Sequence, residues 1–144
     1  MKEYNDTEML NMRLVSSLYR SLKALRRKEF AKISETGVTF AQFEVLVIAY
    51  HFGPLTVGNI IDRTLSSIGN ISLVISNLVK DGYLQSIISE KDRRSKLISL
   101  TDKGLEFMED FFPVHLENLD GILSIYTDDE KEMLLHLVKK LYKQ

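Results

Sequence analysis

The stretch that decides the fold is residues 66–104, which read SSIGNISLVISNLVKDGYLQSIISEKDRRSKLISLTDKG. In its first part the large apolar residues recur every three or four positions and therefore share one helical face, namely Ile68, Ile71, Val74, Ile75 and Leu78. This spacing predicts a helix that begins at Ser66 or Ser67 and ends near Lys80. The opposite face of this helix is polar and is therefore not needed for packing in the core.

The hydrophobic period changes after Asp81-Gly82. Residues 84–89 and 96–100 carry β-branched residues in near alternation, which is typical of strands. The loop between them, residues 90–95, is polar and charged throughout. We therefore predict a two-stranded hairpin with a basic tip directly after the helix.

Three helices are predicted before this stretch. The first, over about 5–36, is marked by a stripe of Leu10, Leu14, Leu18, Leu22 and Leu25. A capping box of Asn5 and Glu8 fits its start and Gly37 fits its end. A second helix opens at Thr39, with Gln42 in the capping-box position, and stops at Gly53-Pro54. A short third helix covers 57–63.

The chain returns to helix over about 102–143, where we expect Pro113 to kink or restart the helix and Thr127 with Glu130 to form a third capping box. The three helices between Thr39 and Lys80, followed by the hairpin, have the order of a winged helix-turn-helix. The predicted fold is therefore mainly α with a small β-hairpin wing. It forms a single domain over 1–144, with a DNA-reading head at about 39–101 between the flanking helices.

Composition fits an ordinary globular protein, with 144 residues, 44% hydrophobic and 27% charged. No apolar run approaches the roughly 20 residues that span a bilayer, and the first residues lack the order of a signal peptide, so a cytoplasmic location without membrane contact is expected. Cysteine is absent, which excludes disulfides and thiol redox sensing. The net charge is −1, but residues 63–103 carry seven Lys or Arg against four Asp or Glu, whereas 104–144 carry four against nine. The middle of the chain is thus the part suited to phosphate.

The polar face of the predicted helix is a candidate for reading DNA. Small and amide side chains can lie close to base edges in a major groove, and an exposed leucine can touch a thymine methyl group. The alternative is an ordinary solvated face. The candidate residues are Ser66, Ser67, Gly69, Asn70, Ser72, Leu73, Ser76, Asn77 and Lys80.

The hairpin tip favours the DNA interpretation over an ordinary charged turn. Its candidate contacts are Lys91, Asp92, Arg93, Arg94 and Lys96. A basic wing beside a polar helix lets one element enter the major groove while the other reaches the backbone or minor groove. We expect Asp92 to hold Arg94 in a fixed pose for this contact.

Several segments resemble one family of regulators. They are Val38-Thr39-Phe40-Ala41-Gln42-Phe43-Glu44-Val45-Leu46, Gly69-Asn70-Ile71-Ser72, 78–84, Asp92-Arg93-Arg94, 98–104 and 111–115. In order and spacing they are similar to the MarR (multiple antibiotic resistance regulator) family over nearly the whole chain. The resemblance implies a repressor of transcription that binds a palindromic operator in double-stranded DNA as a homodimer, with the flanking helices as the dimerisation surface. The chain departs from many relatives in a recognition helix poor in Arg and Lys.

The resemblance also implies a small aromatic effector, bound in a cleft between the dimer helices and the reading head. The residues that we expect to line it are Tyr19, Phe30, Tyr50, His51 and Phe52, although a core role is the alternative for most of them. Bound to DNA, the protein would be associated with the nucleoid.

Nothing in the sequence predicts an enzyme. His51, His115 and His136 lack the spacing of zinc ligands, and there is no glycine loop for phosphate or nucleophile elbow around a serine. We therefore expect no metal, cofactor or catalytic residue. One alternative stays open, a protein-interaction module on a winged-helix scaffold with weakened DNA binding. The few cations of the recognition helix favour that alternative, and the intact wing argues against it.

Overall fold

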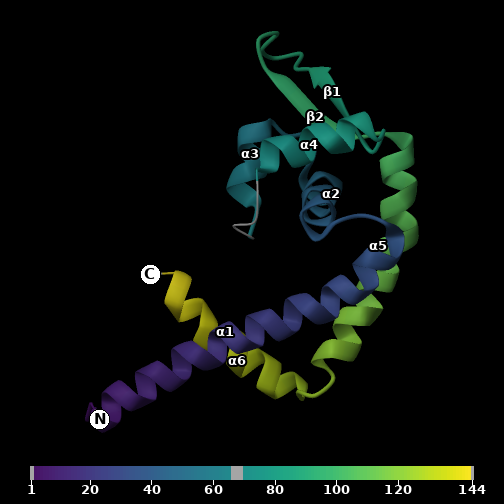
Figure 1. The fold of residues 1–144 in the computed structure, drawn as a ribbon. Coiled ribbons are helices and arrows are strands. Elements are labelled where there is room, and N and C mark those ends of the chain that lie inside the picture. The colour runs from purple at the N-terminus through teal and green to yellow at the C-terminus, as the bar shows by residue number, and fades with distance from the viewer. Residues whose placement is uncertain (1, 66–69, 144) are drawn as a thin grey trace. The chain divides into compact units, whose positions relative to one another are not determined.

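The computed structural model describes residues 2–65 and 70–143 (Figure 1). The predicted contacts Ser66, Ser67 and Gly69 lie outside the described residues. The chain forms two compact units, one of Met1–Lys28 with Leu116–Gln144 and one of Glu29–His115.

The predicted fold class is confirmed, because the structure is mostly helical with one antiparallel hairpin. The elements in chain order are α1 (Asp6–Ile33), a 3-10 turn (Ser34–Thr36), α2 (Phe40–Phe52), α3 (Val57–Arg63), α4 (Ile71–Lys80), β1 (Leu84–Ile88), β2 (Lys96–Leu100), α5 (Asp102–Leu123) and α6 (Asp128–Tyr142). No helix in the described parts of the chain is long and apolar enough to cross a membrane.

The three predicted capping boxes are confirmed. At the start of α2, Thr39 Oγ1 accepts from the Gln42 amide at 3.1 Å, and Gln42 Oε1 accepts from the Thr39 amide at 3.0 Å. The Asn5–Glu8 and Thr127–Glu130 pairs repeat this arrangement. Each box satisfies backbone N–H groups that the first helical turn leaves without partners.

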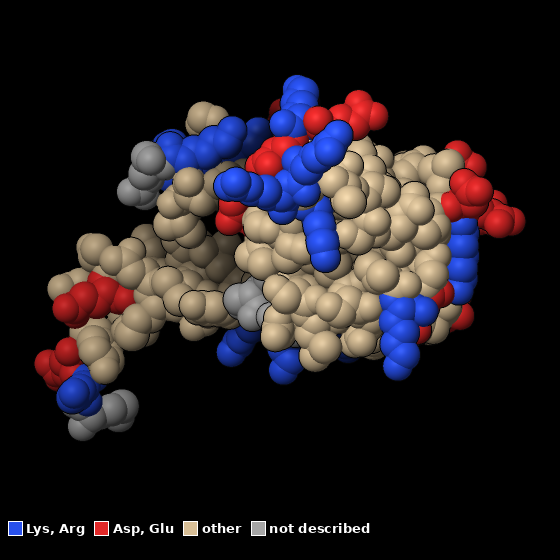
Figure 2. Space-filling model, turned by 90° about the horizontal axis from the view of Figure 1, so that it is seen from above, with Lys and Arg blue, Asp and Glu red and all other residues tan. Residues whose placement is uncertain are grey.

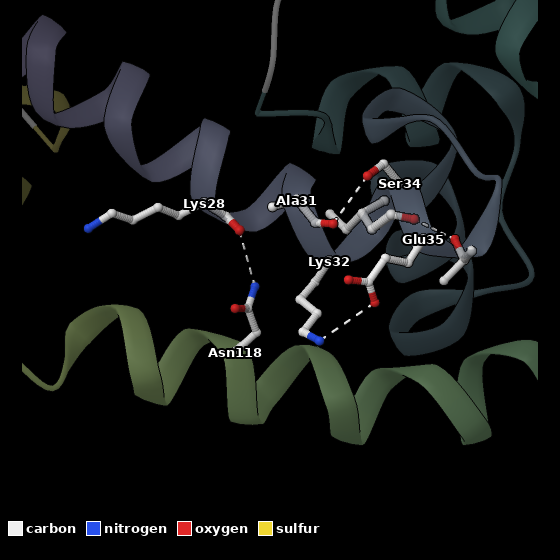
Figure 3. Close-up of polar contacts among 8 residues, drawn as sticks. Lys28, Ala31, Lys32, Ser34, Glu35 and Asn118 are labelled. Carbon is white, nitrogen blue, oxygen red and sulfur yellow. Dashed lines mark hydrogen bonds and ion pairs between the residues drawn. The ribbon is translucent and has the colours of Figure 1, made fainter.

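The end of the first helical segment also agrees with prediction. Gly37 has a φ of 80°, the left-handed conformation that glycine adopts without strain, and its amide donates to Ser34 O. Just before it, Ser34 Oγ donates to Ala31 O, and Lys32 Nζ lies 3.6 Å from Glu35 Oε2 (Figure 3).

The start of α4 differs from prediction. Asn70 has an extended backbone, and its Oδ1 accepts from the Leu73 amide at 3.3 Å, which makes it the N-cap. The helix therefore begins at Ile71 and not at Ser66 or Ser67. The reason is that an asparagine side chain competes well for the free amides of a first turn, so a cap forms inside the apolar periodic stretch.

The hairpin has the predicted strands, with Leu84 opposite Leu100 and Ile88 opposite Lys96. A third segment joins it, which the sequence did not indicate. Leu55, between α2 and α3, exchanges two backbone hydrogen bonds with Ile98, at 3.0 and 2.7 Å. The wing is thus attached to the helical part of its unit by main-chain bonds as well as by packing.

The core of the Glu29–His115 unit is formed by buried aliphatic and aromatic side chains from every element. Its largest fully buried members are Ile33, Leu46, Ile60, Leu78, Leu84 and Met108. The predicted inner face of α4 is confirmed where it is described, because Ile71, Ile75 and Leu78 are buried and Val74 is half-buried. This packing leaves the other side of α4 toward solvent.

The other unit is different, because its apolar stripes are exposed. Leu10, Leu14 and Leu22 of α1 and Leu137 and Leu141 of α6 each expose more than half of their surface. Asn118 Nδ2 of α5 donates to Lys28 O of α1 at 3.4 Å (Figure 3). A single chain therefore leaves much of these stripes uncovered.

The expected restart at Pro113 is wrong, since α5 runs from Asp102 to Leu123 with Pro113 inside it. Proline removes one backbone donor, the one that would bond to the carbonyl of Glu109. Met108 and Phe111 belong to the hydrophobic core, and Phe112 packs against it. The stabilisation from this packing outweighs the loss of one backbone hydrogen bond.

Candidate nucleic-acid interface

The predicted reading face of α4 is exposed wherever the structure describes it. Asn70, Ser72, Leu73, Ser76, Asn77 and Lys80 are all open to solvent. Leu73 exposes 57% of its surface although large apolar side chains are usually covered. The face therefore offers hydroxyl, amide and methyl groups side by side, which are the groups that read base edges.

Two of these side chains already have partners within the helix. Asn70 Oδ1 is taken up by the N-cap, and its Nδ2 has no hydrogen-bond partner among the described residues. Ser76 Oγ donates to Ser72 O at 3.0 Å, which leaves its oxygen lone pairs as acceptors. A bidentate contact from Asn70 to adenine, which uses Oδ1 as well, would require the cap to open.

Asp92 organises the wing tip through the backbone. Its Oδ1 accepts from the Arg94 amide at 3.0 Å and its Oδ2 accepts from Ser95 Oγ at 3.1 Å. Its carbonyl accepts from the Ser95 amide, and its amide donates to Ser89 Oγ. Asp92 thus holds the backbone of Arg94 and not its guanidinium, which was the group expected, because no ion pair joins the two side chains among the described residues. The short side chain of Asp92 reaches the amide two residues on, which closes an Asx-type turn.

The four cations of the wing, Lys91, Arg93, Arg94 and Lys96, are exposed. Within the described ranges none of them forms an ion pair. Seen from above, Lys and Arg side chains gather around the projecting hairpin with a few acidic ones among them, beside a broad uncharged surface (Figure 2). Such unpaired cations can contact phosphates without first breaking a salt bridge.

Leu65, which follows α3, is held by a residue to which sequence analysis gave no role. Glu44 Oε1 of α2 accepts from the backbone amide of Leu65 at 2.5 Å. Leu65 itself is 98% exposed. The two residues are 21 positions apart, and a glutamate on a largely apolar helix was the only signal in the sequence.

The end of α4 is fastened to the start of α5 by Thr101 and Lys103. The sequence showed only that the helical pattern resumes there. Gly104 is buried against this contact, and a Cβ on it would overlap the carbonyl oxygen of Tyr83.

Three of the proposed effector-binding residues are consecutive at the end of α2. Tyr50 and His51 lie edge to face with ring centroids 5.1 Å apart, and Phe112 lies 5.0 Å from His51. Phe30 is 44% exposed, and Tyr19, in the other unit, is 71% exposed. Whether these residues line an effector site remains a prediction.

A buried histidine lies at the edge of this aromatic group. His115 is 8% exposed, and its ring is 4.8 Å from Phe43 and 5.8 Å from Phe112. Burial lowers the pKa of His115 from 6.5, so the ring is neutral near pH 7. Its Nδ1 has no hydrogen-bond partner among the described residues. Within those residues no group of His, Asp and Glu is placed to hold a metal ion.

Comparison with known proteins gives one consistent result. A model of the MarR family matches residues 38–96. The HTH-type transcriptional regulator YkoM of Bacillus subtilis is 31% identical over 138 residues, which cover 95% of this chain and 90% of YkoM. MhqR of the same organism, also an HTH-type transcriptional regulator, is 30% identical over 128 residues, covering 89% and 86%. A solved MarR-like transcription regulator from Bacillus cereus has the same fold, with a TM-score of 0.82, 22% identity and coverage of 94% and 97%.

Proposed function

Because the chain belongs to the MarR family of DNA-binding transcriptional regulators, we propose that it is a repressor that binds a palindromic operator as a homodimer. The observation that carries the proposal is the exposed polar face of α4 next to four exposed cations on the hairpin tip, which form no ion pair with any described residue. The α4 face would read base edges in the major groove. The wing would bind the adjacent backbone or minor groove. Its place of action would be the cytoplasm, at the nucleoid.

The exposed stripes of α1 and α6 support the homodimer. Isolated apolar residues on a surface are ordinary, but helices that expose a leucine at most turns need a partner surface. Two copies joined through these helices would present two reading heads related by a two-fold axis. Such a dimer reads half-sites about one helical turn, roughly 10 bp, apart.

A small aromatic effector would release the repressor from DNA. The proposal is supported by the exposed rings at the end of α2, where His51 contacts Tyr50, Phe52 and Phe112. A flat aromatic ligand could stack on, or meet edge to face, the exposed rings of His51 and Phe52. An effector that binds there would have to prefer the conformation that fits DNA poorly.

The test is fluorescence anisotropy with duplexes from the region upstream of the gene and with duplexes that the protein selects from a random-sequence pool. Affinity is measured at several salt concentrations for the wild type, for Arg94→Ala and for Lys2→Ala, a control that removes an exposed cation outside the interface. Each phosphate contact contributes about −0.9 to the slope of log K against log salt. We expect Arg94→Ala to weaken binding and to flatten the slope by about 1.8, because the homodimer loses one contact from each wing, and Lys2→Ala to do neither.

Two results would overturn the proposal. A selected duplex without two-fold symmetry, or a monomer at the concentration where binding saturates, would refute the palindromic homodimer. A folded dimer that selects no sequence would favour the other candidate, an interaction module that uses the acidic stretch 104–144.

A further inference from the structure

The C-terminal end of α4 is closed by the chain itself in a Schellman motif. The Tyr83 amide donates to Leu78 O at 2.9 Å, and the Gly82 amide donates to Val79 O at 3.1 Å. Gly82 takes a φ of 84°, which a residue with a side chain adopts only with strain. This motif leaves the carbonyls of Asp81, Gly82 and Tyr83 for other donors.

The start of α5 supplies those donors, and we call this contact the α4–α5 joint. Lys103 Nζ donates to Asp81 O at 2.7 Å, Thr101 Oγ1 donates to Gly82 O, and the Thr101 amide donates to Tyr83 O at 3.1 Å. Thr101 Oγ1 also accepts from the Gly104 amide and so caps the first turn of α5. Three consecutive carbonyls at the end of one helix are thereby fixed to the first turn of another.

Lys103 is the only charged member of the joint to contribute through its side chain among the residues described here. Its ammonium lies over the Tyr83 ring, 4.3 Å from the centroid, and bonds the Asp81 carbonyl at the negative end of the α4 dipole. A charge-assisted hydrogen bond and a cation–π contact are each stronger than a neutral surface contact. Together, these two contacts of Lys103 fix the C-terminal end of α4.

We propose that Lys103 is a positioning residue for DNA recognition, which sets the direction of α4 through the carbonyl of Asp81 and the ring of Tyr83. The inference rests on the sequence-specific DNA binding proposed above. A helix of ten residues is about 15 Å long, so a tilt of roughly 10° about one end moves the other end by about 2.6 Å. Such a movement separates donors from base acceptors that must lie within about 3.2 Å. Asn77 and Ser76, nearer the released end than Ser72, would lose their base contacts first, whereas contacts to phosphate on flexible lysine side chains would adapt.

A direct phosphate contact by Lys103 is the competing explanation, and salt dependence separates the two. A positioning residue affects the selected sequence and leaves non-specific binding and the salt slope unchanged. A phosphate contact affects all sequences alike, and its loss from both protomers of the dimer lowers the slope by about 1.8. Lys80, on the exposed end of α4, serves as the comparator for this second behaviour.

The experiment measures the affinity of Lys103→Met, Lys103→Arg and Lys80→Met for a duplex selected by the wild type and for a scrambled duplex of the same composition. We expect Lys103→Met to bind the selected duplex about tenfold more weakly and the scrambled duplex equally well, at an unchanged salt slope. Lys103→Arg keeps a donor and a cation over the ring and should restore most of the affinity. Equal losses on both duplexes with a lower slope, or no loss at all, would overturn the proposal.

A second variant and a second readout keep the test decisive. Tyr83→Leu removes the ring without changing the charge, and it replaces Lys103→Met if that variant proves too unstable to measure. We expect Tyr83→Leu to lower the ratio of the affinities for the selected and the scrambled duplex by about threefold. Hydrogen exchange of the Tyr83 amide in the protein without DNA should be faster in Lys103→Met than in Lys80→Met. Equal exchange rates would refute the positioning role of Lys103, whatever the DNA assay shows. A wild type that discriminates between no DNA sequences would instead refute the proposed function.

Discussion

Two glycines in α5 make a matched pair, because the same substitution should have opposite effects on them. A Cβ at Gly104 would overlap the Tyr83 carbonyl oxygen and approach Leu100 Cδ2 to 3.1 Å. A Cβ at Gly121 would meet no atom within 4 Å among the described residues apart from the backbone of its own helix turns. Both residues are helical, so each alanine brings the same gain in helix propensity, about 0.5–1 kcal/mol.

The free energies follow from these contacts. Forcing a methyl group into a packed site costs about 1–3 kcal/mol. The upper end applies to Gly104, because the obstacle is a backbone oxygen that also accepts from the Thr101 amide and cannot rotate away. After the propensity gain, Gly104→Ala should destabilise the fold by about 2 kcal/mol, while Gly121→Ala should stabilise it by about 0.5–1 kcal/mol.

Urea unfolding, followed by circular dichroism at one fixed protomer concentration, measures both effects. With an m-value of about 2 kcal/mol/M, the midpoint of Gly104→Ala should fall by about 1 M and that of Gly121→Ala should rise slightly. Shifts of both alanines in the same direction, or a Gly104→Ala midpoint equal to that of the wild type, would show that the close approach to Tyr83 does not exist.

Three further outcomes are expected. Asp92→Ala should weaken DNA binding several-fold in the anisotropy assay although it removes a negative charge, because the turn loses its bonds to the Arg94 amide and Ser95 Oγ. Asp92→Asn keeps an acceptor and should bind DNA at least as tightly as the wild type. Leu78→Ala empties a fully buried site and should lower the free energy of unfolding by about 2–5 kcal/mol, and a loss below 1 kcal/mol in urea titration would contradict the packing. Because burial lowers the pKa of His115, the unfolded chain takes up a proton first as the pH falls below 6.5, so stability is full above that pH and declines beneath it. The His115→Phe variant should therefore lose less stability between about pH 7.5 and 5.5 than the wild type, and an equal loss would assign the decline to other groups.

Local signals in the sequence predicted most of the fold. The capping boxes of Thr39 and Thr127 depend on residues three positions apart, and the inner face of α4 depends on a spacing of three or four. The strands of the hairpin followed from alternation. Where two local signals competed, prediction was less accurate, because Asn70 caps α4 inside an apolar stretch that continues on both sides of it.

The missing parts of the site share one physical property, which is long separation in sequence. Glu44 holds the Leu65 amide from 21 residues away, Lys103 holds the Asp81 carbonyl from 22 residues away, and Leu55 pairs with Ile98 across a whole helix-turn-helix. A side chain that bonds a backbone group leaves no complementary residue in the sequence, so neither charge pattern nor hydrophobic period reveals it. The candidate contacts and the nearby Asp92 could be named from the sequence, but the distant residues that hold these contacts in place could not.

The wing and α4 are both held by contacts of Thr101. Asp92 fixes the tip by two bonds to neighbouring residues, while β2 is fixed at its middle by Leu55 and at its end by the Thr101 amide. The same Thr101 side chain accepts from the amide that begins α5 and donates to the turn that ends α4. The proposed base-reading helix and the proposed phosphate-binding wing are therefore both joined to Thr101, at the point where β2 ends and α5 starts. A change in direction of this first turn of α5 would move both proposed DNA contacts at once.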